Sequence, residues 1–306
     1  MLNQLLVRFV LVLYAMSLLS FLACARASSD NRVGLLETGR ASKLLSPPAP
    51  DAELKIVSYN IRWRGGEELR RIIELLRQDE KLGRASIIGL QEVDRNKKRT
   101  GNRNTVRELA EGLGMYYAWA APPPAPGAKE QEEETGVAIL SAYPMDEVRC
   151  VVLPHPGPGG RRRVALGATL KIGATQVRVY SVHAETRISV EDRMEQLQAV
   201  LDDLKQAKTA HVIVLGDFNT WQGSAGRETV KLFSKAGFTT PLPEDEPTIA
   251  SKQFIFTFKL KLDWIWLRGF KATGYGIEQK INISDHWPLW VRAGIEAAGT
   301  TAGQKH

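Results

Sequence analysis

Cysteine is scarce in this chain, which carries only Cys24 and Cys150 among its 306 residues. Cys24 stands in an N-terminal segment typical of a leader, and cleavage after residue 25 or 27 would leave Cys150 alone. The mature chain would then have no intrachain disulfide, which excludes the disulfide-rich class of small secreted proteins. Cys150 is isolated in a Val-Arg-Cys-Val-Val run, so we predict a small buried hydrophobic residue instead of a nucleophile or zinc ligand.

Long hydrophobic runs are also scarce, and the apolar segment at residues 9–24 is short for a bilayer span. It follows a short N-terminal region with one positive charge and precedes two small-x-small sites, Ala23-Cys24-Ala25 and Ala25-Arg26-Ala27. This arrangement predicts a secretory signal peptide over residues 1–27, and therefore an exported protein, periplasmic or extracellular. Two alternatives stay open: an uncleaved anchor, and a bacterial lipoprotein whose signal ends before a lipidated Cys24.

Charge of one sign does not dominate the chain. Lys and Arg number 41 against 34 acidic residues, which gives a formal net charge of +7 and a pI near 9.4. This mild excess favours approach to polyanions, such as nucleic acid, anionic lipid or phosphorylated sugars, although many proteins carry such a charge without any charged partner. Hydrophobic content of 43% and charged content of 25% are typical of a soluble globular protein.

The chain shows no short tandem repeat and no domain break after residue 54. Residues 28–53 contain Ser, Arg and Pro and predict a flexible linker, residues 54–295 form one domain, and residues 296–306 a disordered tail. Helical periodicity is found at 67–78, 105–113, 189–208 and 226–235, and strand patterns at 56–61, 87–91, 136–141, 148–153, 164–172, 177–183, 212–216, 262–267 and 287–293. Adjacent strands without helices between them, beside strand–helix–strand units, predict an α/β fold of two packed mixed sheets flanked by helices.

Polar side chains follow several of these apolar strands directly, which places them at the rim of a sheet. Glu92 follows Ile88-Gly89-Leu90-Gln91 and is suited to bind Mg²⁺, which prefers oxygen ligands and needs only one or two carboxylates. Asn60 ends the first strand and could hold a metal-bound water or a phosphate oxygen. Taken singly, each of these residues is as well explained by a cap or a solvated turn.

Gly216-Asp217-Phe218-Asn219 is more specific, because Asp217 and Asn219 alternate onto one face after a tight exit from the strand. An acid and an amide side by side can orient an attacking water and grip a phosphoryl oxygen. A carboxylate such as Asp263 can fix the tautomer of His286, leaving the second ring nitrogen to act on substrate. His183 also ends a strand, where a lone histidine is usually structural.

Six motifs occur in the order found in the endonuclease/exonuclease/phosphatase superfamily, which includes deoxyribonuclease I, exonuclease III, neutral sphingomyelinases and inositol polyphosphate 5-phosphatases. The chain resembles this superfamily over about residues 54–294. The motifs that carry the resemblance are Ser58-Tyr59-Asn60-Ile61, Leu90-Gln91-Glu92-Val93, Ser181-Val182-His183, Gly216-Asp217-Phe218-Asn219, Leu262-Asp263-Trp264-Ile265 and Ser284-Asp285-His286.

The resemblance implies a four-layer α/β sandwich and a metal-assisted hydrolase of phosphate esters, with Mg²⁺ or Mn²⁺ as cofactor. It implies metal binding by Glu92, with Asn60 and Asp285 nearby, and catalytic roles for His183, Asp217, Asn219, Asp263 and His286. Tyr180, earlier on the strand of His183, and Arg163, in an Arg161-Arg162-Arg163 run, are expected to contact substrate. The general base is left open between Asp217 and His286.

The resemblance does not select the substrate, which could be a lipid headgroup, a sugar phosphate or a nucleic acid. Basic residues after Glu92 suit an extracellular deoxyribonuclease I-like endonuclease, although they also suit a solvated loop, and Glu130–Glu134 would repel DNA near the site. A sphingomyelinase-like phosphodiesterase or a phosphatase is the main alternative, and a non-catalytic binding module on this fold is a further one. No obligate protein partner is implied, and we expect a monomer.

Overall fold

The computed structural model describes residues 33–49, 52–125, 134–207, 209–253 and 256–296. The chain divides into two compact units, 1–35 and 36–306, and everything below concerns the second. Of the first unit, only the 3-10 turn η1 (Val33–Leu35) is described. The predicted signal peptide lies outside the described residues, as does the predicted tail from residue 297. Among the helices that are described, none has the length and apolar character needed to cross a bilayer.

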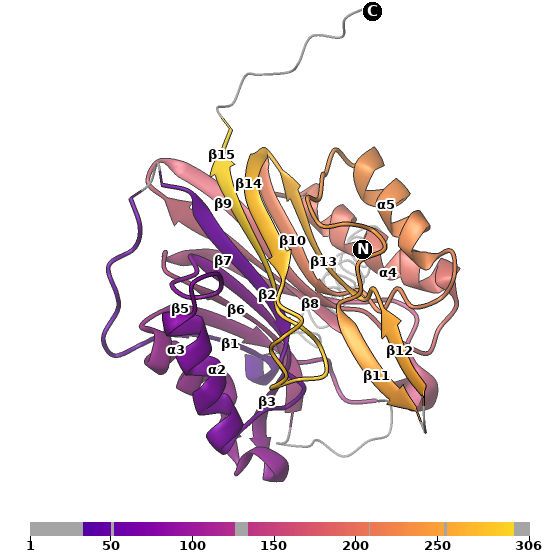
Figure 1. Ribbon diagram of the computed structural model, residues 1–306, viewed down its shortest axis with the longest axis horizontal. Helices are drawn as coiled ribbons and strands as arrows, with labels where there is room; N and C mark the ends of the chain where they lie inside the picture. Colours follow the sequence, from indigo (N-terminus) through magenta and orange to yellow (C-terminus); the bar gives the residue numbers. More distant parts are fainter. Residues whose placement is uncertain (1–32, 50–51, 126–133, 208, 254–255, 297–306) are drawn as a thin grey trace, which may run out of the picture. The chain divides into compact units, whose positions relative to one another are not determined.

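One sheet of the second unit has eight strands in its described part (Figure 1). Its hydrogen-bonded order is β1-β5-β6-β3-β2-β15-β14, with β4 paired to β3. The central neighbours β2 and β3 run parallel and the other pairs antiparallel. The strands are β1 (Leu36–Arg40), β2 (Leu54–Asn60), β3 (Ile87–Lys97), β4 (Arg103–Asn104), β5 (Tyr116–Ala120), β6 (Glu134–Ser141), β14 (Phe270–Ile277) and β15 (Leu289–Ile295).

The second sheet has the order β13-β10-β9-β8-β7. Strands β9 and β10 are parallel, and β10 pairs antiparallel with β13 on its other side. The strands are β7 (Met145–Val152), β8 (Val164–Ile172), β9 (Thr175–His183), β10 (His211–Asp217) and β13 (Asp263–Arg268), and a separate hairpin is formed by β11 (Ile249–Gln253) and β12 (Phe256–Leu260). Both sheets therefore mix parallel and antiparallel pairs, as the sequence predicts.

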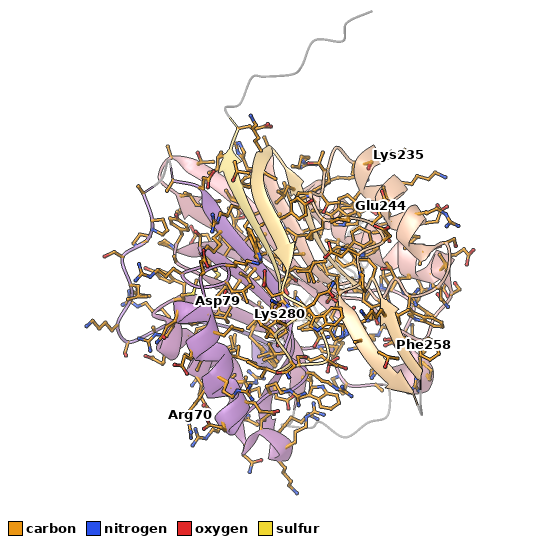
Figure 2. The ribbon with its side chains drawn as sticks, in the orientation of Figure 1. Arg70, Asp79, Lys235, Glu244, Phe258 and Lys280 are labelled. Carbon is orange, nitrogen blue, oxygen red and sulfur yellow. The ribbon has the colours of Figure 1, made fainter. Side chains whose placement is uncertain are left out.

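Four helices complete the described layers: α2 (Gly66–Gln78), α3 (Thr105–Leu113), α4 (Val190–Leu204) and α5 (Ala225–Lys235). Helices α2 and α3 lie beside the first sheet, and α4 and α5 beside the second (Figure 1). Arg70 and Lys235 lie on the outer faces of α2 and α5 (Figure 2), as expected for helices that bury one stripe. This arrangement of mixed sheets and flanking helices is the predicted α/β sandwich.

The main core lies between the inner faces of the two sheets. Ile56 and Ile87 of the first sheet belong to the same buried cluster as Val179 and Ile213 of the second. The sheets approach closely, since a Cβ atom on Gly89 would lie only 1.9 Å from a methyl carbon of Leu215. Because both sheets are anchored to one core, side chains at their ends are held at a defined separation.

Residues 28–53 are predicted to be a flexible linker, but residues 36–40 of this segment form strand β1. Strand β1 pairs antiparallel with β5 at the edge of the first sheet. The Glu37 carboxylate accepts hydrogen bonds from Arg95, Arg107 and Tyr117. Burial alone would raise the pKa of Glu37, but these donors lower it below its usual value. Ion pairs with distant residues thus order a segment whose own composition suggested a linker.

Gly216 precedes Asp217 in β10 and has a positive φ of 136°. A Cβ atom there would lie 2.0 Å from the carbonyl oxygen of Val182 on the neighbouring strand. We expect Gly216→Ala to lower the free energy of unfolding by about 2–4 kcal/mol, measured by urea denaturation. Gly226→Ala, in α5 where a Cβ meets no atom within 4 Å, is the matched control and should stabilise slightly. Equal stability of the two variants would contradict the expectation.

Candidate active site

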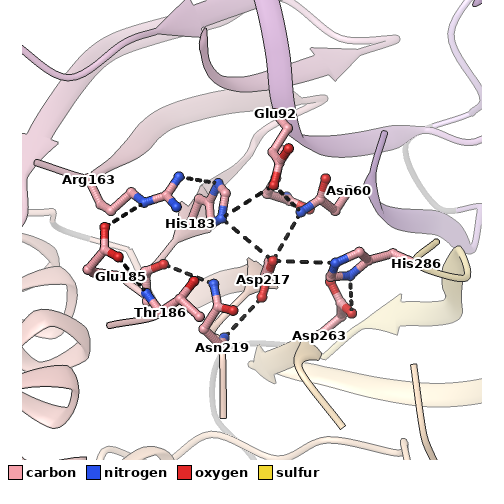
Figure 3. Close-up of polar contacts among 12 residues, drawn as sticks. Asn60, Glu92, Arg163, His183, Glu185, Thr186, Asp217, Asn219, Asp263 and His286 are labelled. Atoms are coloured by element: carbon pink, nitrogen blue, oxygen red, sulfur yellow. Dashed lines mark hydrogen bonds and ion pairs between the residues drawn. The ribbon is translucent and has the colours of Figure 1, made fainter. Parts of the chain in front are cut away.

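Three adjacent strands of the second sheet carry polar residues in one row at the same edge of the sheet. In the parallel β9–β10 pair, Asp217 is opposite His183, and in the antiparallel β10–β13 pair Asp217 is also opposite Asp263. All three side chains are buried. Register alone therefore brings two acids and an imidazole together at the end of the sheet, with Asp217 in the middle (Figure 3).

The first sheet contributes Asn60 from the end of β2 and Glu92 from the middle of β3. The Asn60 Nδ2 atom donates to Asp217 Oδ2 at 3.0 Å and lies 3.3 Å from Glu92 Oε1, so one amide joins both sheets. Glu92 has a positive φ of 57° and interrupts the pairing of β3 with β6 as a bulge between Gln91 and Val93. A bulge redirects a side chain, and here it turns Glu92 toward the row of His183 and Asp217.

His183 is held in its neutral form by its surroundings. Arg163 Nη1 lies 3.2 Å from His183 Nδ1, and a guanidinium can only donate, so Nδ1 accepts and Nε2 carries the proton. Burial, followed by the charge of Arg163, lowers the pKa of His183 well below its usual value. The Nε2 atom faces Asp217 Oδ2 at 3.6 Å and Glu92 Oε1 at 4.0 Å. His183 can thus offer a hydrogen-bond donor without a charge.

His286, in contrast to His183, is held in its protonated form by its surroundings. Its Nδ1 atom lies 2.9 Å from Asp263 Oδ2, and its Nε2 atom faces Asp217 Oδ2 at 3.8 Å. Burial alone would lower the pKa of His286, but the charges of Asp263 and Asp217 raise it to about 10. The Thr248 hydroxyl donates to the same Asp263 oxygen at 2.6 Å and so fixes the carboxylate. His286 is therefore an imidazolium at neutral pH, oriented by Asp263.

Asp217 lies between the two histidines, and the pKa of its carboxyl group is raised above the usual value. Burial is the main cause that raises its pKa, to about 7, and the nearby Asp263 charge adds to the effect. Asn219 donates its backbone N–H to Asp217 Oδ1 at 3.0 Å, and its side-chain amide donates to the carbonyl of Ala184. A carboxylate with a pKa near 7 can accept a proton from water at neutral pH.

The residues at this edge also suit a divalent cation. Among the described residues, Glu92 Oε2 and Asp263 Oδ1 are buried and have no hydrogen-bond partner. Asp217, Asp263 and His286 place ligand atoms within 4.8 Å of one another. In this group, however, the Nδ1 atom of His286 is already bonded to Asp263, and its Nε2 atom faces Asp217. The Glu92 carboxylate, with Asn60 beside it, therefore fits a hard cation better than the Asp–Asp–His group does.

Two of the predicted site residues lie differently from expectation. Tyr180 is fully buried, packs in the cluster beneath α4, and donates its hydroxyl proton to Asp203 at 2.7 Å. It is three residues from His183, so it points to the opposite face of β9 and cannot contact substrate at the site. Asp285 forms an ion pair with Arg62 through Oδ2, so one of its two carboxylate oxygens already has a protein partner. Arg163 lies at the site, against His183.

Two supporting residues, Glu185 and Thr248, stand outside the sequence motifs, whereas a third, Ser284, belongs to the Ser284-Asp285-His286 motif. Glu185 is fully buried and accepts from Arg161 and Arg163, which holds Arg163 against His183. Ser284 donates to the carbonyl of Asn60 at 2.8 Å and so joins the His286 loop to β2. Thr248 supports the site through its hydrogen bond to Asp263. Glu185 follows His183 by two residues, so an acid just beyond a predicted site strand is the one available clue.

Comparison with known proteins agrees with this geometry. The model of the endonuclease/exonuclease/phosphatase family matches residues 57–286. No protein with curated annotation matches the sequence.

Similar solved structures include an endonuclease/exonuclease/phosphatase from Beutenbergia cavernae DSM 12333, with a TM-score of 0.63, 19% identity and coverage of 81% of this chain and 72% of that one. The human Nocturnin catalytic domain with bound sulfate has a TM-score of 0.59, 18% identity and coverage of 87% and 100%. ANGEL2, described as a 2',3'-cyclic phosphatase, has a TM-score of 0.59, 15% identity and coverage of 88% and 100%. At these identities the likeness concerns the fold alone.

Proposed function

The chain belongs to the endonuclease/exonuclease/phosphatase family, and on that premise we propose that it is a divalent-metal-dependent hydrolase of phosphate esters. The observation that carries the proposal is the position of Asp217. Its carboxylate is bonded to Asn60 and faces both His183 and His286 within 3.8 Å. A proton acceptor, a neutral donor and a cationic donor converge there on one small volume, which is what in-line attack of water on phosphorus requires.

In this mechanism Asp217 is the general base. Its pKa of about 7 allows it to be ionised at neutral pH and still accept a proton from water. His286, with a pKa of about 10, is already protonated, which argues against it as the base and favours a role in stabilising charge. Asn219 keeps Asp217 in place through its backbone N–H. Of the two candidates that the sequence leaves open, Asp217 and His286, these pKa values support Asp217 as the general base.

The other groups stabilise the charge that develops on the phosphoryl oxygens. His286 offers a positive charge from one side, and His183 offers an uncharged N–H from the other. Glu92 would hold the divalent cation, Mg²⁺ or Mn²⁺, with the side chain of Asn60 next to it. When bound, such a cation neutralises developing negative charge on the phosphoryl group. Arg163 keeps His183 uncharged and correctly oriented, so its role is to position that histidine.

We include export in the proposal, supported by the apolar segment at residues 9–24, which is typical of a signal peptide. An exported hydrolase would meet phosphate esters outside the cytoplasm. Fractionation of cells that express the full chain, followed by detection of the protein, distinguishes an exported enzyme from a cytoplasmic one.

The purified protein should hydrolyse bis-p-nitrophenyl phosphate with Mg²⁺ present, and EDTA should abolish the reaction. Excess Mg²⁺ or Mn²⁺ should restore it. The same assay with plasmid DNA, RNA, sphingomyelin and inositol phosphates identifies the preferred ester. Turnover that persists unchanged in EDTA would contradict metal dependence. Absence of turnover on every ester, by a protein whose circular dichroism is that of a folded α/β domain, would contradict the hydrolase itself.

A further inference from the structure

Two tryptophans beside the active site are exposed and have no part in the proposed chemistry. Trp63 is 38% exposed and Trp221 is 46% exposed. The other five of the seven tryptophans are each no more than 9% exposed, as is usual for so large an apolar side chain. These five are Trp119, Trp264, Trp266, Trp287 and Trp290. We therefore expect Trp63 and Trp221 to have a function at the surface.

The two tryptophans follow strands of different sheets, Trp63 after β2 of the first sheet and Trp221 after β10 of the second. Trp63 follows Asn60 by three residues, and its backbone N–H donates to the carbonyl of Glu92 at 3.0 Å. Trp221 follows Asn219 by two residues, and its Nε1 donates to the carbonyl of Thr186 at 3.3 Å. At about 3.8 Å per residue, each tryptophan Cα lies within about 11 Å of its site residue. Trp63 is therefore next to Glu92, and Trp221 is next to the segment that follows His183 and Glu185.

Each indole is fixed in orientation without being buried. The Arg99 guanidinium lies 4.1 Å from the centre of the Trp63 ring, and Asp94 accepts two hydrogen bonds from Arg99, at 2.7 and 2.8 Å. Arg62 and Trp63 both have positive φ, 44° and 60°. Such strain in non-glycine residues is maintained by the surrounding structure and is common at ligand sites. Trp221 is fixed by its hydrogen bond to Thr186.

Charged and polar side chains, not apolar ones, surround the indoles. Arg62 and Arg99 lie against Trp63 and are paired with Asp285 and Asp94, and Arg187, exposed, follows the Thr186 that binds Trp221. A membrane-binding surface would gather aromatic and aliphatic side chains into a continuous apolar patch. Isolated rings among arginines match instead the way in which proteins bind single-stranded nucleic acid, with bases stacked on aromatic rings and phosphates near cations.

We propose that Trp63 and Trp221 are stacking platforms for the bases on the two sides of the scissile phosphate, so that the substrate is a nucleotide phosphodiester. This inference rests on the proposed hydrolase. It adds a specificity site, because each ring would bind a planar group and leave the reacting atoms to the residues around Asp217. Stacking of a base on an aromatic side chain contributes roughly tenfold in affinity, and two platforms act on the two flanking nucleosides.

The test compares two phosphodiesters that differ only in their bases: the dinucleotide TpT and its abasic analogue, in which both bases are absent. The measured quantity is the ratio of kcat/KM for TpT to kcat/KM for the analogue, with Mg²⁺. We expect a ratio well above 10 for the unmodified protein, and a fall of about tenfold in Trp63→Ala and in Trp221→Ala. Trp63→Phe and Trp221→Phe should retain most of the ratio, since a ring remains.

Tyr275→Ala is the matched control, because Tyr275 is an equally exposed aromatic residue on β14 and should leave the ratio unchanged. A ratio near 1 in the unmodified protein, or one that both alanine variants leave intact, would overturn the stacking proposal while the hydrolase stands. Loss of binding to anionic phosphatidylserine vesicles in both variants, with an intact ratio, would also overturn it in favour of a lipid surface. No turnover of any ester would remove the hydrolase and this inference together.

Discussion

Asp217→Asn should lower kcat for phosphate ester hydrolysis by about 10³-fold at neutral pH. The amide keeps nearly the same shape, but its single acceptor oxygen can accept from only one of Asn60 and the backbone of Asn219, and the amide cannot take a proton from water. The measurement is the initial rate with Mg²⁺, on protein whose unfolding midpoint is close to that of the unmodified chain. Asp202→Asn, an exposed carboxylate on α4, is the matched control and should have no effect.

The dependence of kcat on pH tests the same assignment. A base must be unprotonated to act, so the rate should rise with pH through about 7, the pKa of Asp217. It should fall again above about 10, where His286 loses its proton. Asp263→Asn removes the charge that raises the pKa of His286, so the alkaline limb should move to lower pH. A rate for Asp217→Asn close to that of the unmodified protein would rule out Asp217 as the base.

Glu92→Gln should reduce kcat/KM by about 10²–10⁴-fold at low Mg²⁺. A neutral amide lacks the charge that holds a divalent cation, and in the folded protein Glu92 Oε2 has no hydrogen-bond partner among the described residues. Higher Mg²⁺ should recover part of the activity, so the Mg²⁺ concentration for half-maximal rate should rise. Calorimetric titration with Mn²⁺ provides a readout independent of turnover.

Glu228→Gln, an exposed carboxylate in α5, controls for the loss of one negative charge. Unchanged Mn²⁺ affinity in Glu92→Gln would mean that the cation binds elsewhere, and the group of Asp217, Asp263 and His286 would be the next candidate. The two variants thus separate the metal site from the proton acceptor.

Much of the site could be predicted because strand ends are local features. His183 and Asp217 each end an apolar strand and Asp263 begins one, and register then places them side by side. The direction in which a side chain points from its strand was harder to predict. The resemblance implies a substrate contact for Tyr180, whereas the alternation of faces along β9 turns this side chain away from His183 and toward α4.

Supporting contacts escaped prediction because they join residues far apart in the chain. Thr248 binds Asp263 from outside the strand, and Glu37 binds Arg95 and Arg107 from a segment that composition alone assigned to a linker. A single sequence carries no periodic signal for such pairs. The protonation states of the histidines likewise depend on Arg163 and Asp263, whose approach only the folded chain reveals.

Strand β15 is the last described strand of the chain, yet it pairs with β2, which is near the start of the domain. His286, a few residues before β15, is joined through Ser284 to the carbonyl of Asn60. The chain must therefore have left the ribosome as far as β15 before Asn60 and His286 can meet. Until then the proposed site is incomplete, and the proposed hydrolysis of phosphate esters could not begin.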